Sequence, residues 1–132
     1  MVKRILLAED DADTSFIVRK MLTQAGYEVQ CMAEGTQLVE NRNDWPDLFI
    51  LDKDLPAIDG VALCKFFKLK DATRNIPVII ISGHHHQKRK ALKAGANAFI
   101  EKPFEQKKLL RAIAKCVKGL PSGLKEDELF LL

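Results

Sequence analysis

The sequence has few of the residues that build disulfide frameworks, zinc sites or membrane spans. Its 132 residues include only three cysteines, Cys31, Cys64 and Cys116, which are widely spaced. An odd number at this spacing favours reduced thiols over a disulfide framework or a zinc site. No apolar run is long enough to span a bilayer, and no charged start followed by an apolar region indicates a signal peptide. We therefore expect a cytoplasmic protein that needs neither cross-links nor a membrane to fold.

Aromatic residues are scarce as well, at 7% of the chain, and there is no internal repeat or low-complexity stretch. Hydrophobic residues make up 47% and charged residues 30%, which is typical of soluble globular proteins. A chain of this length forms one domain and can bury a core. We expect a single domain over residues 1–120, followed by a linker or tail stub at residues 121–132.

The net charge of +3 is distributed unevenly along the chain. Residues 1–83 contain ten Lys and Arg against thirteen Asp and Glu, whereas residues 84–118 contain ten against two. The last segment, residues 119–132, has one Lys and three acids. Neither a recognition motif nor stacking aromatic residues accompany the basic segment, so we do not expect direct nucleic-acid binding. Two interpretations stay open for it, a solvated helix surface and a docking surface for an acidic partner.

Short apolar, β-branched runs alternate with segments in which apolar residues recur at helical spacing, which is typical of repeated β–α units. Helices are required on both faces of the resulting parallel sheet, because crossovers between parallel strands are right-handed. The weakest expected helix is residues 37–43, which is apolar only at Leu38 and Val39. The five expected strands are residues 4–8, 28–31, 48–52, 77–82 and 98–101, and the five expected helices are residues 14–25, 37–43, 60–69, 87–94 and 106–120.

The sequence also indicates where some helices begin and which side they bury. Asp13 or Thr14 is expected to cap the first helix and Gly26 to end it. Helical spacing places two sets of apolar residues on inner faces. They are Leu63, Phe66 and Phe67 in the third helix, and Leu109, Leu110, Ile113, Val117 and Leu120 in the last.

Polar residues close four of the five expected strands. In an open parallel sheet these positions share the carboxyl edge, where ligands bind. The edge is therefore expected to gather carboxylates, a hydroxyl group and an ammonium group, a set that suits a divalent metal and a phosphoryl group. The residues are Glu9 and Asp10 after the first strand, Asp52 at the end of the third, Ser82 at the end of the fourth, and Lys102 after the fifth.

Two or three carboxylates at close range are costly unless a cation lies between them. Mg²⁺ prefers one or two carboxylates, with waters and substrate phosphate completing its shell. We therefore expect Mg²⁺ to be held by Asp10 and Asp52, with Glu9 acting directly or through water and the backbone carbonyl of Asp54 as a further ligand. A carboxylate in this position can also act as a nucleophile toward phosphorus. Lys102 and the Ser82 hydroxyl can then stabilise the transferred oxygens.

Four motifs in this order resemble the response-regulator receiver domains of two-component signalling. They are ILLAEDD (residues 5–11), PDLFILDKDLPAIDG (46–60), VIIISG (78–83) and AFIEKPF (98–104). Together they cover about residues 3–119. The resemblance implies a flavodoxin-like, doubly wound (βα)5 fold whose parallel sheet has the strand order 2-1-3-4-5.

The resemblance also assigns roles at the expected site. It implies that Asp52 is the phosphoacceptor, supplied by a histidine kinase or phosphotransfer protein. It implies that Glu9 and Asp10 bind Mg²⁺ and that Asp54 offers its carbonyl to the metal. Lys102 would contact the phosphoryl group, and the bond from Lys102 to Pro103 would be cis.

Signal output follows from the same resemblance. Ser82 would move toward the phosphoryl group and Phe99 would turn inward with it, although Phe99 is also compatible with a plain core role. The face formed by residues 87–94, 98–101 and 106–120 would then contact a downstream protein, an output domain or a second copy of the chain.

Some residues depart from the family's pattern. Gly83 stands where a small alanine is usual, and Phe99 lacks the hydroxyl group of a tyrosine. Lys53 and Asp54 place charges beside the site, and His84 lies two residues after Ser82. The resemblance implies that the positions of Asp54 and His84 tune dephosphorylation by water.

Other interpretations compete with the signalling switch. Asp52-Lys53-Asp54 resembles the motif of haloacid-dehalogenase-type phosphatases, but that family carries the motif on its first strand. A receiver-like interaction module that does not need phosphate is a second alternative. His84, His85 and His86 suggest a metal site, yet three adjacent residues on regular backbone cannot all face one ion. We expect no enzyme with an external substrate, and the chain is either a stand-alone receiver or a piece of a longer regulator.

Overall fold

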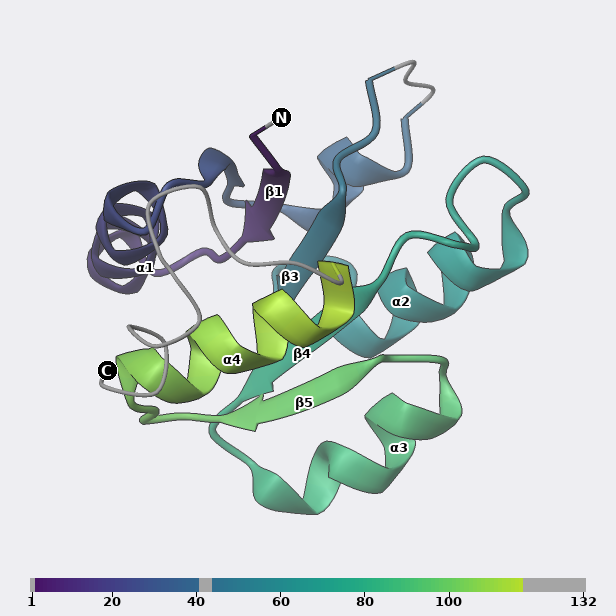
Figure 1. Ribbon diagram of the computed structural model, residues 1–132. Coiled ribbons are helices and arrows are strands. Elements are labelled where there is room, and N and C mark those ends of the chain that lie inside the picture. The colour runs from purple at the N-terminus through teal and green to yellow at the C-terminus, as the bar shows by residue number, and fades with distance from the viewer. Residues whose placement is uncertain (1, 41–43, 118–132) are drawn as a thin grey trace.

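The computed structural model describes residues 2–40 and 44–117, which form a five-stranded parallel sheet between two layers of helices (Figure 1). The strand order is β2-β1-β3-β4-β5, as expected. Neighbouring strands are paired in parallel throughout, for example Ile5 with Leu48 and Ile80 with Phe99. The strands are β1 (Arg4–Ala8), β2 (Glu28–Met32), β3 (Leu48–Asp52), β4 (Val78–Ser82) and β5 (Ala98–Glu101).

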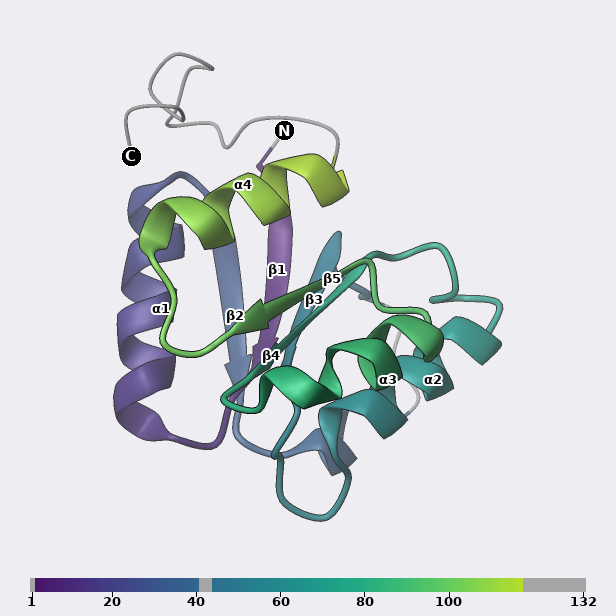
Figure 2. The same ribbon diagram turned by 90° about the horizontal axis from the view of Figure 1, so that it is seen from below.

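The helices cover both faces of the sheet. One face carries α1 (Ala12–Gln24) and α4 (Gln106–Val117), and the other carries α2 (Gly60–Leu69) and the short α3 (Lys88–Lys93) (Figure 2). Short 3-10 helices occupy Gly35–Leu38 and His85–Gln87. None of the helices in the described ranges has the length and apolarity that a membrane crossing requires.

The sheet separates two hydrophobic cores, because successive residues of a strand point to opposite faces. In β3, Leu48 and Ile50 join the core under α1 and α4, whereas Phe49 and Leu51 join the core under α2 and α3. Every residue of β3 and β4 is buried, as expected for central strands of a doubly covered sheet. The Phe49 ring stacks on that of Phe67 with centroids 4.2 Å apart, which fixes α2 against the sheet.

The helix ends differ from the sequence prediction in one instructive place. The prediction of Asp13 or Thr14 as the cap of α1 is wrong, because the cap is Asp11 and the helix begins at Ala12. The Asp11 carboxylate accepts a hydrogen bond from the Thr14 backbone N–H at 2.9 Å, satisfying a donor that the first turn leaves free. The helix ends before Gly26, whose φ of 104° suits glycine, as predicted.

The second expected helix, residues 37–43, is wrong as an α-helix. The described part of this segment is a 3-10 turn that ends at Leu38, and residues 41–43 lie outside the described residues. Two apolar residues cannot provide the inner face that stabilises a longer helix. Phe66, expected inward, is 37% exposed at the edge of α2, while Leu63 and Phe67 are fully buried.

The last helix, α4, buries Leu109, Leu110 and Ile113 as predicted, and Val117 is half-buried at its end. The rest of the expected helix, residues 118–120 with Leu120, and the expected linker or tail at residues 121–132 lie outside the described residues.

Candidate functional site

The carboxyl ends of β1, β3 and β4 bring the expected residues together at one edge of the sheet. Asp52 is the last residue of β3, Glu9 directly follows β1, and Ser82 ends β4. Glu9 and Asp52 are each 5% exposed, Ser82 is fully buried, and Asp10 is exposed. Parallel pairing produces this clustering, because it aligns strand ends that are far apart in the sequence.

Lys102 joins the two buried carboxylates. Its Nζ donates to Glu9 Oε1 at 2.7 Å and to Asp52 Oδ2 at 2.5 Å. The backbone N–H of Lys102 donates to the carbonyl of Ser82 at 2.8 Å, and the peptide bond from Lys102 to Pro103 is cis, as predicted. The backbone hydrogen bond fixes where the Lys102 side chain begins, and the ion pairs fix its ammonium group.

Burial and hydrogen bonding shift the acids in opposite directions. Burial, helped by the neighbouring Asp52, raises the pKa of Glu9 to about 7. Burial also opposes ionisation of Asp52, but hydrogen bonds from Glu9, Lys102 and the Asp54 backbone outweigh it and hold the pKa of Asp52 below its ordinary value. Burial disfavours the Lys102 ammonium too, yet its bonds to both carboxylates raise the pKa of Lys102. The site therefore favours an ionised Asp52 beside a permanently charged lysine.

The acidic residues also form a group that suits a metal ion. Glu9, Asp10 and Asp52 each present one carboxylate oxygen, and these three oxygens lie within 4.8 Å of one another. An all-oxygen set with one exposed member fits Mg²⁺, which keeps several waters in its shell. A cation at this position would also offset the repulsion between the Glu9 and Asp52 carboxylates, which helps burial to raise the pKa of Glu9.

The turn after β3 fixes the second oxygen of Asp52. The Asp54 N–H donates to Asp52 Oδ1 at 2.8 Å, so the carboxylate is held at both oxygens. The exposed Asp54 side chain lies 3.4 Å from the Lys53 ammonium and 3.8 Å from His84 Nε2. The proposed use of the Asp54 carbonyl as a metal ligand stays a prediction.

Gly60 is a site-forming residue that the sequence analysis did not single out. A Cβ atom at this position would lie 2.2 Å from the carbonyl oxygen of Asp52, so only glycine permits the close approach of α2 to the end of β3. The Gly60 N–H donates to the Lys53 carbonyl at 2.9 Å. The preceding Asp59 caps α2, but the close approach to the Asp52 carbonyl has no local signal in the sequence.

Ser82 and Phe99 occupy neighbouring strands beside the acidic cluster. The Ser82 hydroxyl accepts a hydrogen bond from the His84 N–H at 3.0 Å. Phe99 is half-buried and packs against the core under α2 and α3. Gly83, which follows Ser82, is exposed and has nothing within 4 Å of the position of a Cβ, so a small side chain there would meet no neighbour. The geometry is compatible with the switch that the resemblance implies, which stays a prediction.

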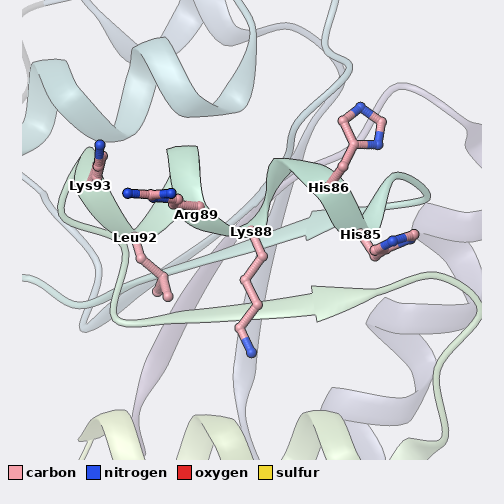
Figure 3. A pocket seen from close by; sticks show the side chains of 6 residues that line it. All are labelled: His85, His86, Lys88, Arg89, Leu92 and Lys93. Carbon is pink, nitrogen blue, oxygen red and sulfur yellow. The ribbon is translucent and has the colours of Figure 1, made fainter.

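The three adjacent histidines do not form a metal centre in the part of the chain that the structure describes, where the acidic cluster is the group found. His84 faces Asp54, and His85 Nδ1 lies 3.8 Å from Glu101 Oε1. Figure 3 shows His85 and His86 pointing in different directions from the 3-10 turn that precedes α3. Their exposure and divergence support the solvated interpretation.

Comparisons with known proteins agree with this geometry. The family model described as "Response regulator receiver domain" matches residues 5–114. The chemotaxis protein CheY of Bacillus subtilis is 36% identical over 117 residues, which cover 87% of this chain and 98% of CheY. The phosphate regulon transcriptional regulatory protein PhoB of Escherichia coli is 32% identical over 130 residues, which cover 96% of this chain and 57% of PhoB. The chain thus spans about half the length of the first curated relatives that it matches.

Solved structures show the same fold. A response regulator from Chloroflexus aurantiacus has a TM-score of 0.81 and 31% identity, covering 89% of this chain and 99% of its own. The receiver domain of a sensor histidine kinase from Pseudomonas aeruginosa, whose structure holds a magnesium ion in its active-site cleft, has a TM-score of 0.78 and 26% identity, covering 90% of this chain and all of its own. With its fold, its strand-end acids and its matched family model, this chain belongs to the response-regulator receiver domains.

Proposed function

We propose that this receiver domain accepts a phosphoryl group on Asp52 in a reaction that needs Mg²⁺. The observation that carries the proposal is the double contact of Lys102 with Glu9 and Asp52 at the strand ends. The lowered pKa of Asp52 keeps the carboxylate ionised, which is the form that attacks phosphorus.

The metal would be held by Asp10, Asp52 and Glu9, the last directly or through water, with the Asp54 carbonyl as a further ligand. Its contribution, when bound, is to offset negative charge on the oxygens of the phosphoryl group. Asp10, as the exposed member of the cluster, gives this position access to solvent. The chemistry of the donor set and the magnesium-bound relative both support this part of the proposal.

The transfer itself needs one nucleophile and one leaving group. A carboxylate oxygen of Asp52 forms the new P–O bond while the P–N bond of a phosphohistidine breaks, and the electron pair of that bond stays on the imidazole. Lys102 then moves its ammonium group from Asp52 onto the transferred phosphoryl oxygens, which carry more charge than the carboxylate. The partner that supplies the group would be a histidine kinase or a phosphotransfer protein.

The signal would leave through Ser82 and Phe99. The Ser82 hydroxyl would exchange its bond with the His84 N–H for one with a phosphoryl oxygen, and Phe99 would follow into the vacated space. Both residues border α3 and β5, so the α3–β5–α4 face would change with them. A downstream protein, an output domain or a second copy would contact this face, and the protein would act in the cytoplasm as a signalling module without an external substrate.

The test is intact-mass spectrometry after incubation with acetyl phosphate and Mg²⁺. The chain should gain one phosphoryl adduct that disappears without Mg²⁺ and in Asp52→Ala. Asp54→Ala is the matched control, because it removes a neighbouring carboxylate and leaves the backbone carbonyl in place, and it should keep the adduct. If the chain binds neither the phosphoryl group nor beryllofluoride, the receiver works as an interaction module that does not need phosphate.

A further inference from the structure

The free edge of β5 lies between two hollows whose rims are basic. One hollow, of about 520 Å³, lies between β5 and α4, with Lys108 and Lys115 on its rim and Ala98, Ala112 and Cys116 as its apolar lining. The other, of about 610 Å³, lies on α3 around Leu92 and is ringed by cationic side chains. Because β5 pairs with β4 alone among the described strands, no strand covers its outer edge.

Leu92 gives the α3 hollow an apolar centre. Leu92 is 43% exposed, and the other residues of its six-residue helix are three lysines, an arginine and an alanine. A polar residue at this exposed position would cost the fold little stability. In Figure 3, Lys88 and Leu92 point to the same side of α3, toward β5, while His86 and Lys93 point to the other. An apolar side chain surrounded by cations is suited to a ligand that is both acidic and hydrophobic.

Five of the cations around these hollows have no carboxylate partner within the described part of the chain. No carboxylate there pairs with Lys88, Arg89, Lys93, Lys108 or Lys115. By contrast, Lys102 and Lys107 do have carboxylate partners. The face therefore carries unscreened positive charge at close spacing, and an acidic segment bound there would lower that repulsion.

The chain itself carries a segment of the complementary chemistry. Glu126, Asp127 and Glu128 form an acidic triplet, directly followed by the apolar run of residues 129–132. Glu126 lies nine positions after Val117, the end of α4, and nine steps of extended chain can span about 30 Å. The 12 residues of α4 are only about 18 Å long, so the triplet can reach any position along that helix.

We propose that residues 126–132 bind in cis across the β5 edge. In this arrangement the acidic triplet lies against Lys108 and Lys115 of α4, and the apolar run packs on Leu92 of α3. The segment thereby covers the face through which a receiver would contact a partner, so it competes with that partner. Binding of the segment is independent of phosphorylation and is tested without a phosphodonor.

The experiment records amide spectra of the ¹⁵N-labelled full chain without Mg²⁺. The test variant, Glu126→Lys/Asp127→Lys/Glu128→Lys, should shift the amides of Leu92, Ala98, Ala112 and Lys115. The wild-type spectrum should move in the same direction as salt rises from 0.01 M to 1 M, since the screening length falls from about 30 Å to about 3 Å. The matched control, Glu28→Lys/Glu34→Lys/Asp71→Lys, changes the net charge equally at exposed positions elsewhere and should leave these four amides unchanged.

A reciprocal exchange identifies the contact. Lys108→Glu/Lys115→Glu alone should release the segment, and combining it with the reversed triplet should restore the wild-type positions of the Leu92 and Ala98 amides. Leu129→Ser/Phe130→Ser tests the apolar half separately and should shift Leu92 most. The proposal is overturned if reversing the triplet moves none of the four amides, or if the shifts depend on protein concentration, which would mean that the segment binds a second chain.

Discussion

Replacing Glu9 by glutamine should make the metal-free protein more stable at pH 8, although it removes a residue of the proposed metal site. In the folded protein the pKa of Glu9 is about 7, against an ordinary value of 4.5, mainly because the side chain is buried. The folded state therefore binds more protons than the unfolded state between these values. The stability that protonated Glu9 contributes to the fold is fully present below about pH 4.5 and is lost as the pH rises through about 7.

The size of the effect follows from the shift. One pKa unit corresponds to about 1.4 kcal/mol, so ionising Glu9 in place costs the fold roughly 3 kcal/mol at most. The lowered pKa of Asp52 acts in the opposite direction and offsets part of this cost, so roughly 3 kcal/mol is an upper limit. Glutamine has the shape of protonated Glu9 and can accept from Lys102 through its amide oxygen. For a chain of this size we expect Tm to rise by about 4 to 8 °C.

The assay is thermal unfolding in EDTA at pH 4.5 and pH 8, followed by a Mg²⁺ titration at pH 8. The variant should match the wild type at pH 4.5, exceed it at pH 8, and gain less from Mg²⁺, because ligand stabilisation depends on affinity. Glu28→Gln, at an exposed position of β2, is the control and should change neither curve. A Glu9→Gln protein that is less stable than the wild type at pH 8 in EDTA, or equally shifted at both pH values, would refute the reasoning.

Three further predictions test the parts around Asp52. Gly60→Ala should lower the free energy of unfolding by at least about 2 kcal/mol, because its Cβ would meet the Asp52 carbonyl at 2.2 Å. Gly83→Ala, whose Cβ would have nothing within 4 Å, should change the free energy of unfolding by less than about 0.5 kcal/mol, and urea unfolding compares the two variants. Ser82→Ala should cost about 1 kcal/mol by leaving the His84 N–H without its acceptor, and should still form the phosphoryl adduct in intact-mass spectra. Lys102→Met should lower Tm in EDTA, because it leaves two buried carboxylates without their cation. Mg²⁺ should restore much of the lost Tm, and an unchanged Tm in EDTA would contradict the ion-pair geometry.

Some errors of the sequence prediction have a common physical cause. The cap of α1 lies two or three residues before the predicted Asp13 or Thr14. Asp11, Asp13 and Thr14 are all good caps by type, and only backbone geometry selects the residue whose carboxylate meets a free N–H. The helix expected at residues 37–43 failed because propensity is a weak guide where few apolar residues can pack. Phe66 and Phe67 are adjacent and equally apolar, so the helical period alone could not decide that Phe67 fills the core.

Other features needed contacts between segments that are distant in the chain. Gly60 is required by a carbonyl oxygen eight positions earlier, which no local pattern reveals. The raised pKa of Glu9 needs Asp52 and burial together, and the hollow around Leu92 exists because α3 leaves a leucine exposed among cations.

By itself, the sequence determined that five apolar runs become strands, that helices separate them, and that acids, a hydroxyl group and a lysine follow those runs. It did so because strand burial and helix amphipathicity are local patterns, and because parallel pairing sends every strand end to one edge. Only the tertiary structure decided how that edge is charged: Lys102 meets Glu9 and Asp52 across 93 and 50 residues of chain. Electrostatic energies depend on distance and burial, and both are set by the packing of the whole domain.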